Sequence, residues 1–222
     1  MVSKQPKLAH MMNVVTPWPT ADLITLDEFK TALRIPLTDV SKDDELNMII
    51  DGVSSQMAKF ANRVFGFDEV QETMYNAVDE DRIFLSQWPV KFSDIKALTL
   101  DGVDQLPSHG TVWFLEEKTG TIFWISAPMN GTLFADYSGG YKIPAETPDD
   151  LKRAAQVAMR EDYYMYVRGS LLSGVRAIMH KHARVMYYPP GQLAATQTSG
   201  SSLGPVWQSV QNVLNKYIRY WV

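Results

Sequence analysis

The strongest constraint on the fold is a change of hydrophobic period along the chain. From Leu46 to Val64 the apolar residues recur at the i, i+3, i+4 and i+7 spacing of an amphipathic helix. Between about residues 70 and 137 the pattern changes to short β-branched and aromatic runs separated by turn residues. Helical spacing returns after Thr147. The sequence therefore predicts an α+β fold, with an antiparallel β-subdomain inserted into a helical core.

Local signals predict where the first two helices begin and end. Thr25 and Glu28 have the spacing of a capping box, which predicts a short helix over residues 26–34. Ser41, followed by acidic residues, predicts the start of the long helix. We expect Gly66 to end this helix, because glycine accepts the left-handed conformation found after many helices.

Later signals predict a third helix and a terminal helix. Thr147 followed by Pro148 is typical of a helix start, and Gly169 is expected to end that helix. Residues 170–188 fit a helix in their first part and a strand in their second. Pro205 predicts the start of the last helix.

Six runs in the middle of the chain predict strands. Turn pairs that end in Gly102, Gly120 and Gly131 separate several of them, and residues 112–125 predict a hairpin. The predicted strands are residues 70–75, 82–85, 95–100, 111–115, 121–125 and 133–137.

We therefore expect the following division of the chain. An extended, proline-containing arm spans residues 1–22, and the helical core spans 23–168 with the β-subdomain at about 69–146. Residues 169–204 form an irregular segment and a flexible tether rich in Thr, Ser and Gly, and residues 205–222 form a tethered docking helix.

Charge is distributed unevenly. All 25 acidic residues lie in the first 162 residues together with 15 of the 21 basic ones, so this part carries −10 and the remaining sixty residues carry +6. Such asymmetry is typical of an interaction tail or of complementary faces on neighbouring subunits, and a solvated basic surface is the alternative. The net charge of −4 argues against a protein that binds nucleic acid mainly through phosphates.

Several classes of site are not indicated. The chain has no Cys, which excludes disulfides and thiolate sites and suits a reducing compartment, so we expect assembly in the cytoplasm. It shows neither a long apolar run nor a signal-peptide pattern, so we expect no membrane partner. His180 and His182 lack a third ligand nearby, and the acidic run 79–81 lacks the pattern of a calcium loop. We expect no metal, no cofactor and no catalytic residues.

The last helix is both aromatic and basic. Three interpretations remain open: an anchor on another protein, a cap on the chain's own core, or a surface that stacks single-stranded bases. A flexible tether before the helix favours docking onto a partner. The predicted partner-binding residues are Trp207, Val210, Leu214, Lys216, Tyr217, Arg219, Tyr220 and Trp221.

Several stretches, taken in order, resemble the head-to-tail connector, or adaptor, proteins of long-tailed phages. They are Ile24–Ile35, Lys42–Glu45, Arg82–Val90, Leu100–Val103, Ala135–Tyr141, Ile143–Lys152 and Val206–Arg219. The resemblance implies a structural subunit of the virion neck, without catalysis, in a dodecameric ring through which DNA passes. It implies the portal protein, neighbouring copies and a tail-side neck protein as partners. The alternatives are a tail-completion or tail-terminator ring component, or, from a different class, a soluble domain that binds a small ligand.

Overall fold

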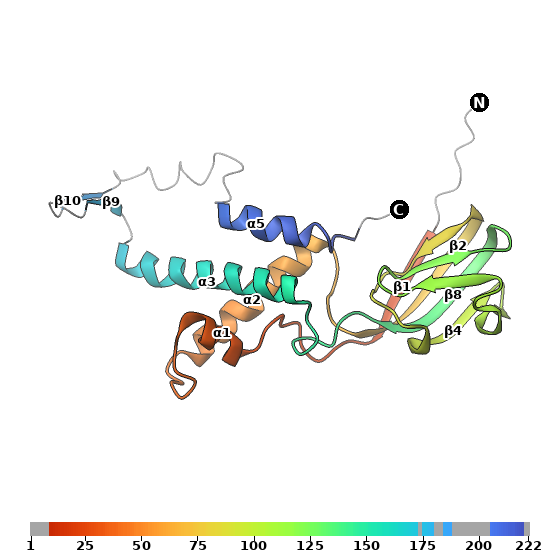
Figure 1. The fold of residues 1–222 in the computed structure, drawn as a ribbon, viewed down its shortest axis with the longest axis horizontal. Coiled ribbons are helices and arrows are strands. Elements are labelled where there is room, and N and C mark those ends of the chain that lie inside the picture. Colours follow the sequence, from red (N-terminus) through yellow and green to blue (C-terminus); the bar gives the residue numbers. More distant parts are fainter. Residues whose placement is uncertain (1–8, 173–174, 180–183, 188–204, 220–222) are drawn as a thin grey trace, which may run out of the picture. The chain divides into compact units, whose positions relative to one another are not determined.

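The computed structural model describes residues 9–172, 175–179, 184–187 and 205–219 (Figure 1). These residues divide into two compact units. The β unit comprises the described residues within 1–22, 58–147 and 218–222, and the helical unit those within 23–57 and 148–217. The chain thus enters and leaves the β unit more than once, as expected for an inserted subdomain.

The helical unit contains most of the helical residues and one small sheet. Its elements are α1 (Leu26–Leu33), α2 (Asp43–Ala61, whose last turn belongs to the β unit), α3 (Asp149–Leu172), β9 (Val175–Met179), β10 (Arg184–Tyr187) and α5 (Pro205–Leu214). No helix among the described residues has the length and apolar character needed to cross a bilayer.

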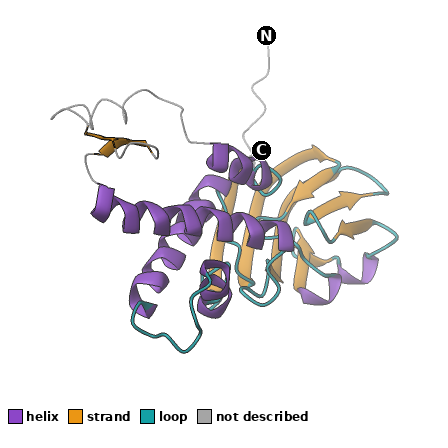
Figure 2. Ribbon diagram, turned by 60° about the vertical axis from the view of Figure 1, so that its left-hand side comes forward, coloured by secondary structure: helices purple, strands orange, loops and turns teal. Residues whose placement is uncertain are grey.

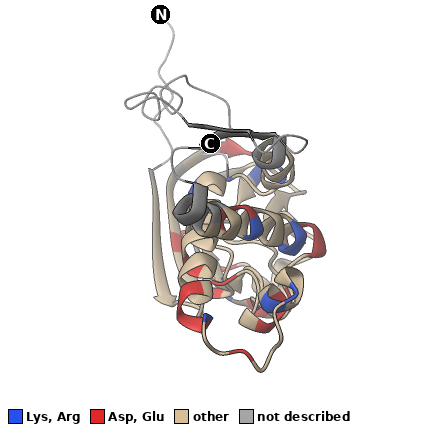
Figure 3. Ribbon diagram, turned by 90° about the vertical axis from the view of Figure 1, so that its left-hand side faces the viewer, with Lys and Arg blue, Asp and Glu red and all other residues tan. Residues whose placement is uncertain are grey.

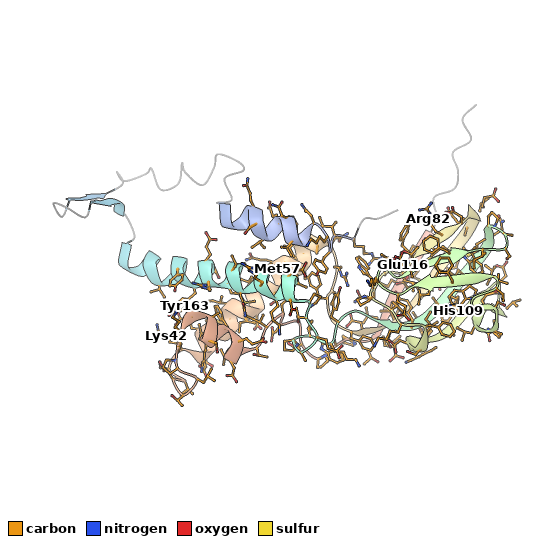
Figure 4. The ribbon with its side chains drawn as sticks, in the orientation of Figure 1. Lys42, Met57, Arg82, His109, Glu116 and Tyr163 are labelled. Atoms are coloured by element: carbon orange, nitrogen blue, oxygen red, sulfur yellow. The ribbon has the colours of Figure 1, made fainter. Side chains whose placement is uncertain are left out.

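The apolar stripes predicted for α2 and α3 form the core of the helical unit. Leu46, Ile50 and Met57 are at most 2% exposed on α2, and Leu151 and Met159 are fully buried on α3. Ion pairs join elements of this unit, and Figure 3 colours the acidic and basic positions along its helices. Two of these pairs are Lys30–Asp43 (2.5 Å) and Lys152–Glu28 (2.7 Å). The Lys42 ammonium also donates to the Tyr163 hydroxyl at 3.2 Å (Figure 4).

The first capping prediction is confirmed, whereas two predicted helix ends are wrong. Thr25 and Glu28 form the reciprocal capping box of α1. The helix α2 ends at Ala61, five residues before the predicted stop at Gly66, and Asn62 takes the left-handed conformation with φ +52°. Asparagine tolerates this conformation better than most residues. The helix α3 continues past Gly169 to Leu172, because an isolated glycine weakens a helix without necessarily ending it.

Gly66 has a packing role in the β unit instead. A Cβ atom at this position would lie 2.8 Å from the Cβ atom of Trp18. Gly140 faces the same segment with φ +110°, and a Cβ atom there would lie 2.0 Å from the Gly66 carbonyl oxygen. Both glycines permit close approach of backbone segments, which a side chain would prevent.

The β unit consists of two antiparallel sheets (Figure 2). One has the strand order β1-β2-β8-β4-β5 and the other the order β3-β7-β6. The strands are β1 (Ala9–Thr16), β2 (Asp68–Glu80), β3 (Arg82–Phe84), β4 (Ile95–Leu100), β5 (Val103–Asp104), β6 (Trp113–Glu116), β7 (Thr121–Trp124) and β8 (Met129–Gly139). All six predicted strands and the predicted hairpin, β6–β7, are present.

One buried cluster holds the two sheets together. The residues Trp113, Ile122, Leu98, Val70 and Tyr137 are fully buried in it. Along β2 the buried and less buried positions alternate, as expected for a strand with one face on a core. The interior of the β unit is therefore filled by its own side chains.

The predicted N-terminal arm contains a strand. Residues 9–16 form β1 and pair antiparallel with β2, from Ala9 opposite Tyr75 to Thr16 opposite Glu69. This pairing joins segments about sixty residues apart, and such distant pairing leaves no mark in a local sequence pattern. The predicted irregular segment and tether, residues 169–204, lie largely outside the described residues. Their described part is regular and not irregular as predicted, because it contains the end of α3 and the strands β9 and β10.

Candidate functional site

The structure places the predicted docking helix against its own unit. The helix α5 packs on α3, and Val210 (1% exposed), Leu214 (0%) and Tyr217 (9%) are buried. These three residues were predicted to face a partner. The apolar stripe of a short terminal helix is the same whether it covers a partner or its own chain, so the sequence pattern could not separate the two cases.

Two other tail contacts converge on Asp150, in the first turn of α3. The Tyr217 hydroxyl donates to one carboxylate oxygen at 2.5 Å, and the Lys216 ammonium lies 3.2 Å from the other. Burial by itself would raise the pKa of Asp150, but the hydrogen bonds from Tyr217 and Lys216 outweigh it and the pKa is lowered. The end of the tail is thus fixed to the start of α3.

This contact gives a prediction with a defined pH dependence. Tyr217→Phe should lower the free energy of unfolding by about 1 kcal/mol at pH 7, since the Asp150 carboxylate is partly exposed. A carboxyl group with a lowered pKa stabilises the fold above its unfolded-state pKa, and this contribution is lost as the pH falls through the folded-state pKa. The difference from wild type should therefore shrink below about pH 4 in denaturant titrations. An equal difference at pH 3 and pH 7 would contradict this account.

The other predicted partner-binding residues that the structure describes belong to different units of the chain. The backbone of Trp207 lies in α5, and Tyr220 and Trp221 lie outside the described residues. Arg219 belongs to the β unit: its backbone N–H donates to the Ala61 carbonyl oxygen at 2.9 Å. Its guanidinium donates to the Ser86 hydroxyl and lies 3.9 Å from the Met12 sulfur.

Arg219 completes a buried polar cluster in the β unit, which we call the Glu72 cluster: His10, Glu72, Ser86, Tyr137 and Arg219. The Glu72 carboxylate is fully buried and accepts hydrogen bonds from the Tyr137 hydroxyl (2.6 Å) and the Ser86 backbone N–H (2.9 Å). Burial raises the pKa of Tyr137 well above its ordinary value, and the charge and hydrogen bond of Glu72 add to this effect. Tyr137 therefore remains a hydrogen-bond donor at neutral pH.

The positive charge of Arg219 stabilises the buried carboxylate. Burial lowers the pKa of Arg219, and the opposing electrostatic interaction with Glu72 acts to raise it. A buried carboxylate is costly unless it is paired and hydrogen-bonded, and this cluster supplies both kinds of partner.

The Glu72 cluster contains Ser, His and Glu side chains, but their geometry does not match a hydrolytic triad. The same ring nitrogen, His10 Nε2, lies 3.3 Å from Glu72 and 3.5 Å from the Ser86 hydroxyl. In a triad the base uses one ring nitrogen for the nucleophile and the other for the carboxylate. The arrangement is suited to holding the tail rather than to activating the serine.

One member of this cluster was detectable in the sequence. Glu72 lies between Val70 and Met74 at the two-residue spacing of the buried face of β2. A charged residue at such a position predicts buried hydrogen-bond partners, although the sequence does not show that these are Tyr137, Ser86 and His10. Among the described residues, no group of three or more possible ligands could hold a metal ion, and His180 and His182 lie outside them.

Comparison with known proteins supports the resemblance predicted from the sequence. Residues 23–84 match the family model of the phage gp6-like head-tail connector protein. The predicted resemblance is confirmed for this segment. The connector segment, residues 23–84, includes α1, α2, β2 and β3. No curated protein matches the chain at a significant level.

Two solved structures extend the similarity beyond the connector segment. A chain in the neck of an empty GTA particle, computed with C6 symmetry, is 16% identical, with a TM-score of 0.52. A chain in the virion of a native gene transfer agent (GTA) particle is 15% identical, with a TM-score of 0.50. Each match covers 96% of this chain and 97% of the other. At these identities the matches show a shared fold over almost the whole chain.

Proposed function

We propose that this chain is a structural subunit of a phage neck, one copy in a ring that joins the DNA-filled head to the tail. The observation that carries the proposal is the agreement of two independent matches. The connector segment matches a head–tail connector family, and the fold of nearly the whole chain matches a chain in a particle neck.

Ring formation and its partners follow from the same proposal. The similar fold occurs in a neck with C6 symmetry, which supports a ring of identical copies. The proposed partners are neighbouring copies, the portal protein and a tail-side neck protein, with twelve copies as the expected number. DNA passes through the ring without sequence-specific contacts, and the net charge of −4 argues against tight binding of the chain to the DNA phosphates.

The proposal includes the virion as the site of action, assembly in the host cytoplasm, and no catalytic step. The geometry of the Glu72 cluster supports the last point, because one nitrogen of His10 faces both neighbours. The predicted contact of the tail with a partner remains part of the proposal, and it includes Trp207, Lys216, Arg219, Tyr220 and Trp221. Val210, Leu214 and Tyr217 are buried where α5 packs on α3, so contact of these three predicted residues with a partner requires α5 to leave α3.

The purified chain is expected to be a monomer or a weak oligomer that forms a ring only on the head. Opposite charges in the two parts of the chain favour contacts between copies, but a closed ring orders many copies at once. Light scattering on the purified chain at micromolar concentration should give a mass near 25.1 kDa. A tight, head-independent dimer at that concentration would count against the prediction.

Removal of the chain from a particle-producing system tests the function. Without it, we expect DNA-filled heads and separate tails in electron micrographs, and restored tailed particles when the wild-type chain is supplied. A small-ligand-binding role predicts normal tailed particles without the chain, and that result would overturn the proposal.

A further inference from the structure

The strand β1 is an open edge of the five-stranded sheet. Among the described strands it pairs only with β2, so one row of its backbone N–H and C=O groups has no strand partner. No charged residue occurs between Ala9 and Thr16. Edge strands usually carry lysine, proline or a bulge that discourages pairing with another chain, and β1 has only a register shift between Val14 and Thr16.

The side chains of β1 add an apolar surface to this edge. Met11 is 57% exposed, Met12 41%, Val14 37% and Val15 45%. Met12 and Val14 lie opposite Glu72 and Val70 of β2, which are almost fully buried. Side chains are therefore more exposed on β1 than at the paired positions of β2. The edge of the sheet is apolar and suited to pairing with another strand.

The hairpin β9–β10 is a pair of strands that is not part of a larger sheet in the described part of the chain. The two strands pair antiparallel with each other and form a two-stranded sheet, with no third strand among the described residues. Isolated two-stranded sheets are marginally stable in water. The hairpin sequence is rich in β-branched and apolar residues, as in a strand that is buried on assembly.

The two elements also carry opposite charge. The strands β9 and β10 contain Arg176 and Arg184 and no acidic residue. The described residues of the β unit contain 14 acidic and 8 basic side chains, a net charge of −6. Approach of the hairpin to the β unit of another copy is therefore electrostatically favourable.

A closed ring of identical copies needs two different surfaces on each copy, one for each neighbour. The β1 edge and the β9–β10 hairpin belong to different units of the chain. One is an open sheet edge and the other is a pair of strands without a larger sheet, so the two surfaces can pair with each other. We propose that the hairpin β9–β10 of one copy adds to the β1 edge of the neighbouring copy and extends its five-stranded sheet. This inference rests on the proposed ring function and names the contact between copies.

Disulfide trapping tests the contact, because the natural chain has no Cys. Asn13→Cys on β1 is combined with Ala177→Cys on β9 or with Val185→Cys on β10, since either strand could join the sheet. The matched control combines Ala177→Cys with Val103→Cys on β5, at the opposite edge of the same sheet, where Val103 is 63% exposed. In purified particles we expect a ladder of covalent multimers on non-reducing gels for at least one β1 pair, and none for the control.

A second set of variants blocks the edge without a crosslink. Met11→Lys combined with Val15→Lys should reduce incorporation into particles at least tenfold, because lysine on an edge strand opposes further pairing. The control combines Val40→Lys with Met48→Lys, two exposed positions of the helical unit (71% and 69%). Both double variants should melt within about 2 °C of wild type, and the control should be incorporated normally.

The outcomes separate this inference from the proposed function. Reduced samples of the same particles show whether the chain is present at all, and its absence would overturn both proposals. Particles that contain the chain but give no ladder, together with normal incorporation of the Met11→Lys and Val15→Lys variant, would overturn the hairpin contact alone. A disulfide that forms only within one copy of the chain, and not between copies, would also overturn the hairpin contact.

Discussion

Deletion of residues 205–222 should lower the free energy of unfolding by 5 kcal/mol or more and shift the melting temperature sharply downward. The deletion removes three buried side chains, Val210, Leu214 and Tyr217, and uncovers the face of α3 on which α5 packs. Burial of one large apolar side chain contributes roughly 1.5–3 kcal/mol, and the cavity left behind adds to the loss. Circular dichroism melts and binding of a hydrophobic dye measure the effect.

A point variant separates loss of packing from loss of a docking segment. Leu214→Ala should cost about 3 kcal/mol, because this side chain is fully buried. Asn212→Ala, at an exposed position of the same helix, should change stability by less than about 0.5 kcal/mol. If the truncated chain melts like wild type but fails to join heads, α5 is a docking segment as the sequence suggested, and its packing on α3 contributes little.

Arg219→Ala should lower the free energy of unfolding by about 2 kcal/mol at neutral pH, because it removes a charge-assisted hydrogen bond to Ser86. The substitution removes the guanidinium that interacts with the buried Glu72 carboxylate and donates to Ser86. The Glu72 carboxylate is fully buried whereas Arg219 is only partly buried, so loss of the guanidinium removes a favourable electrostatic interaction that solvent partly screens. Lys216→Ala is the matched control, three residues earlier, and its exposed ion pair with Asp150 should be worth under about 0.5 kcal/mol.

A double-mutant cycle identifies the cause. Glu72→Gln keeps one oxygen that can accept from Tyr137 and Ser86 and removes the buried charge. In the Glu72→Gln background, Arg219→Ala should therefore cost at least about 1 kcal/mol less than in the wild type. Equal costs in both backgrounds would show that Arg219 acts through packing or through Ser86 and not through the charge of Glu72.

Local signals in the sequence predicted most of the fold. The capping box at Thr25, the apolar stripe of α2 and the glycine turns between strands each depend on residues close together in sequence. Such patterns place helices and strands correctly because they reflect local geometry and one-sided burial. The ends of α2 and α3 were misplaced because Asn62 could end a helix as well as glycine, and Gly169 did not end one.

The features that the sequence did not reveal depend on distant contacts. Pairing of β1 with β2, packing of α5 on α3, and the hydrogen bond from Arg219 to Ser86 each join segments far apart in the chain. The aromatic and basic composition of the tail suggested a partner, since the same residue types serve interfaces and cores. The sequence therefore indicated that the tail takes part in a contact. It did not indicate that Val210, Leu214 and Tyr217 of the tail pack against the chain's own helical unit.

The position of the chain in the particle tests the central claim most directly. Electron cryomicroscopy of tailed particles carrying this chain should show a ring of its copies between head and tail, with the two units of each copy fitted to the density. The account predicts a closed ring around the DNA path. A neck density that fits other proteins only, or copies of this chain located elsewhere in the particle, would contradict it.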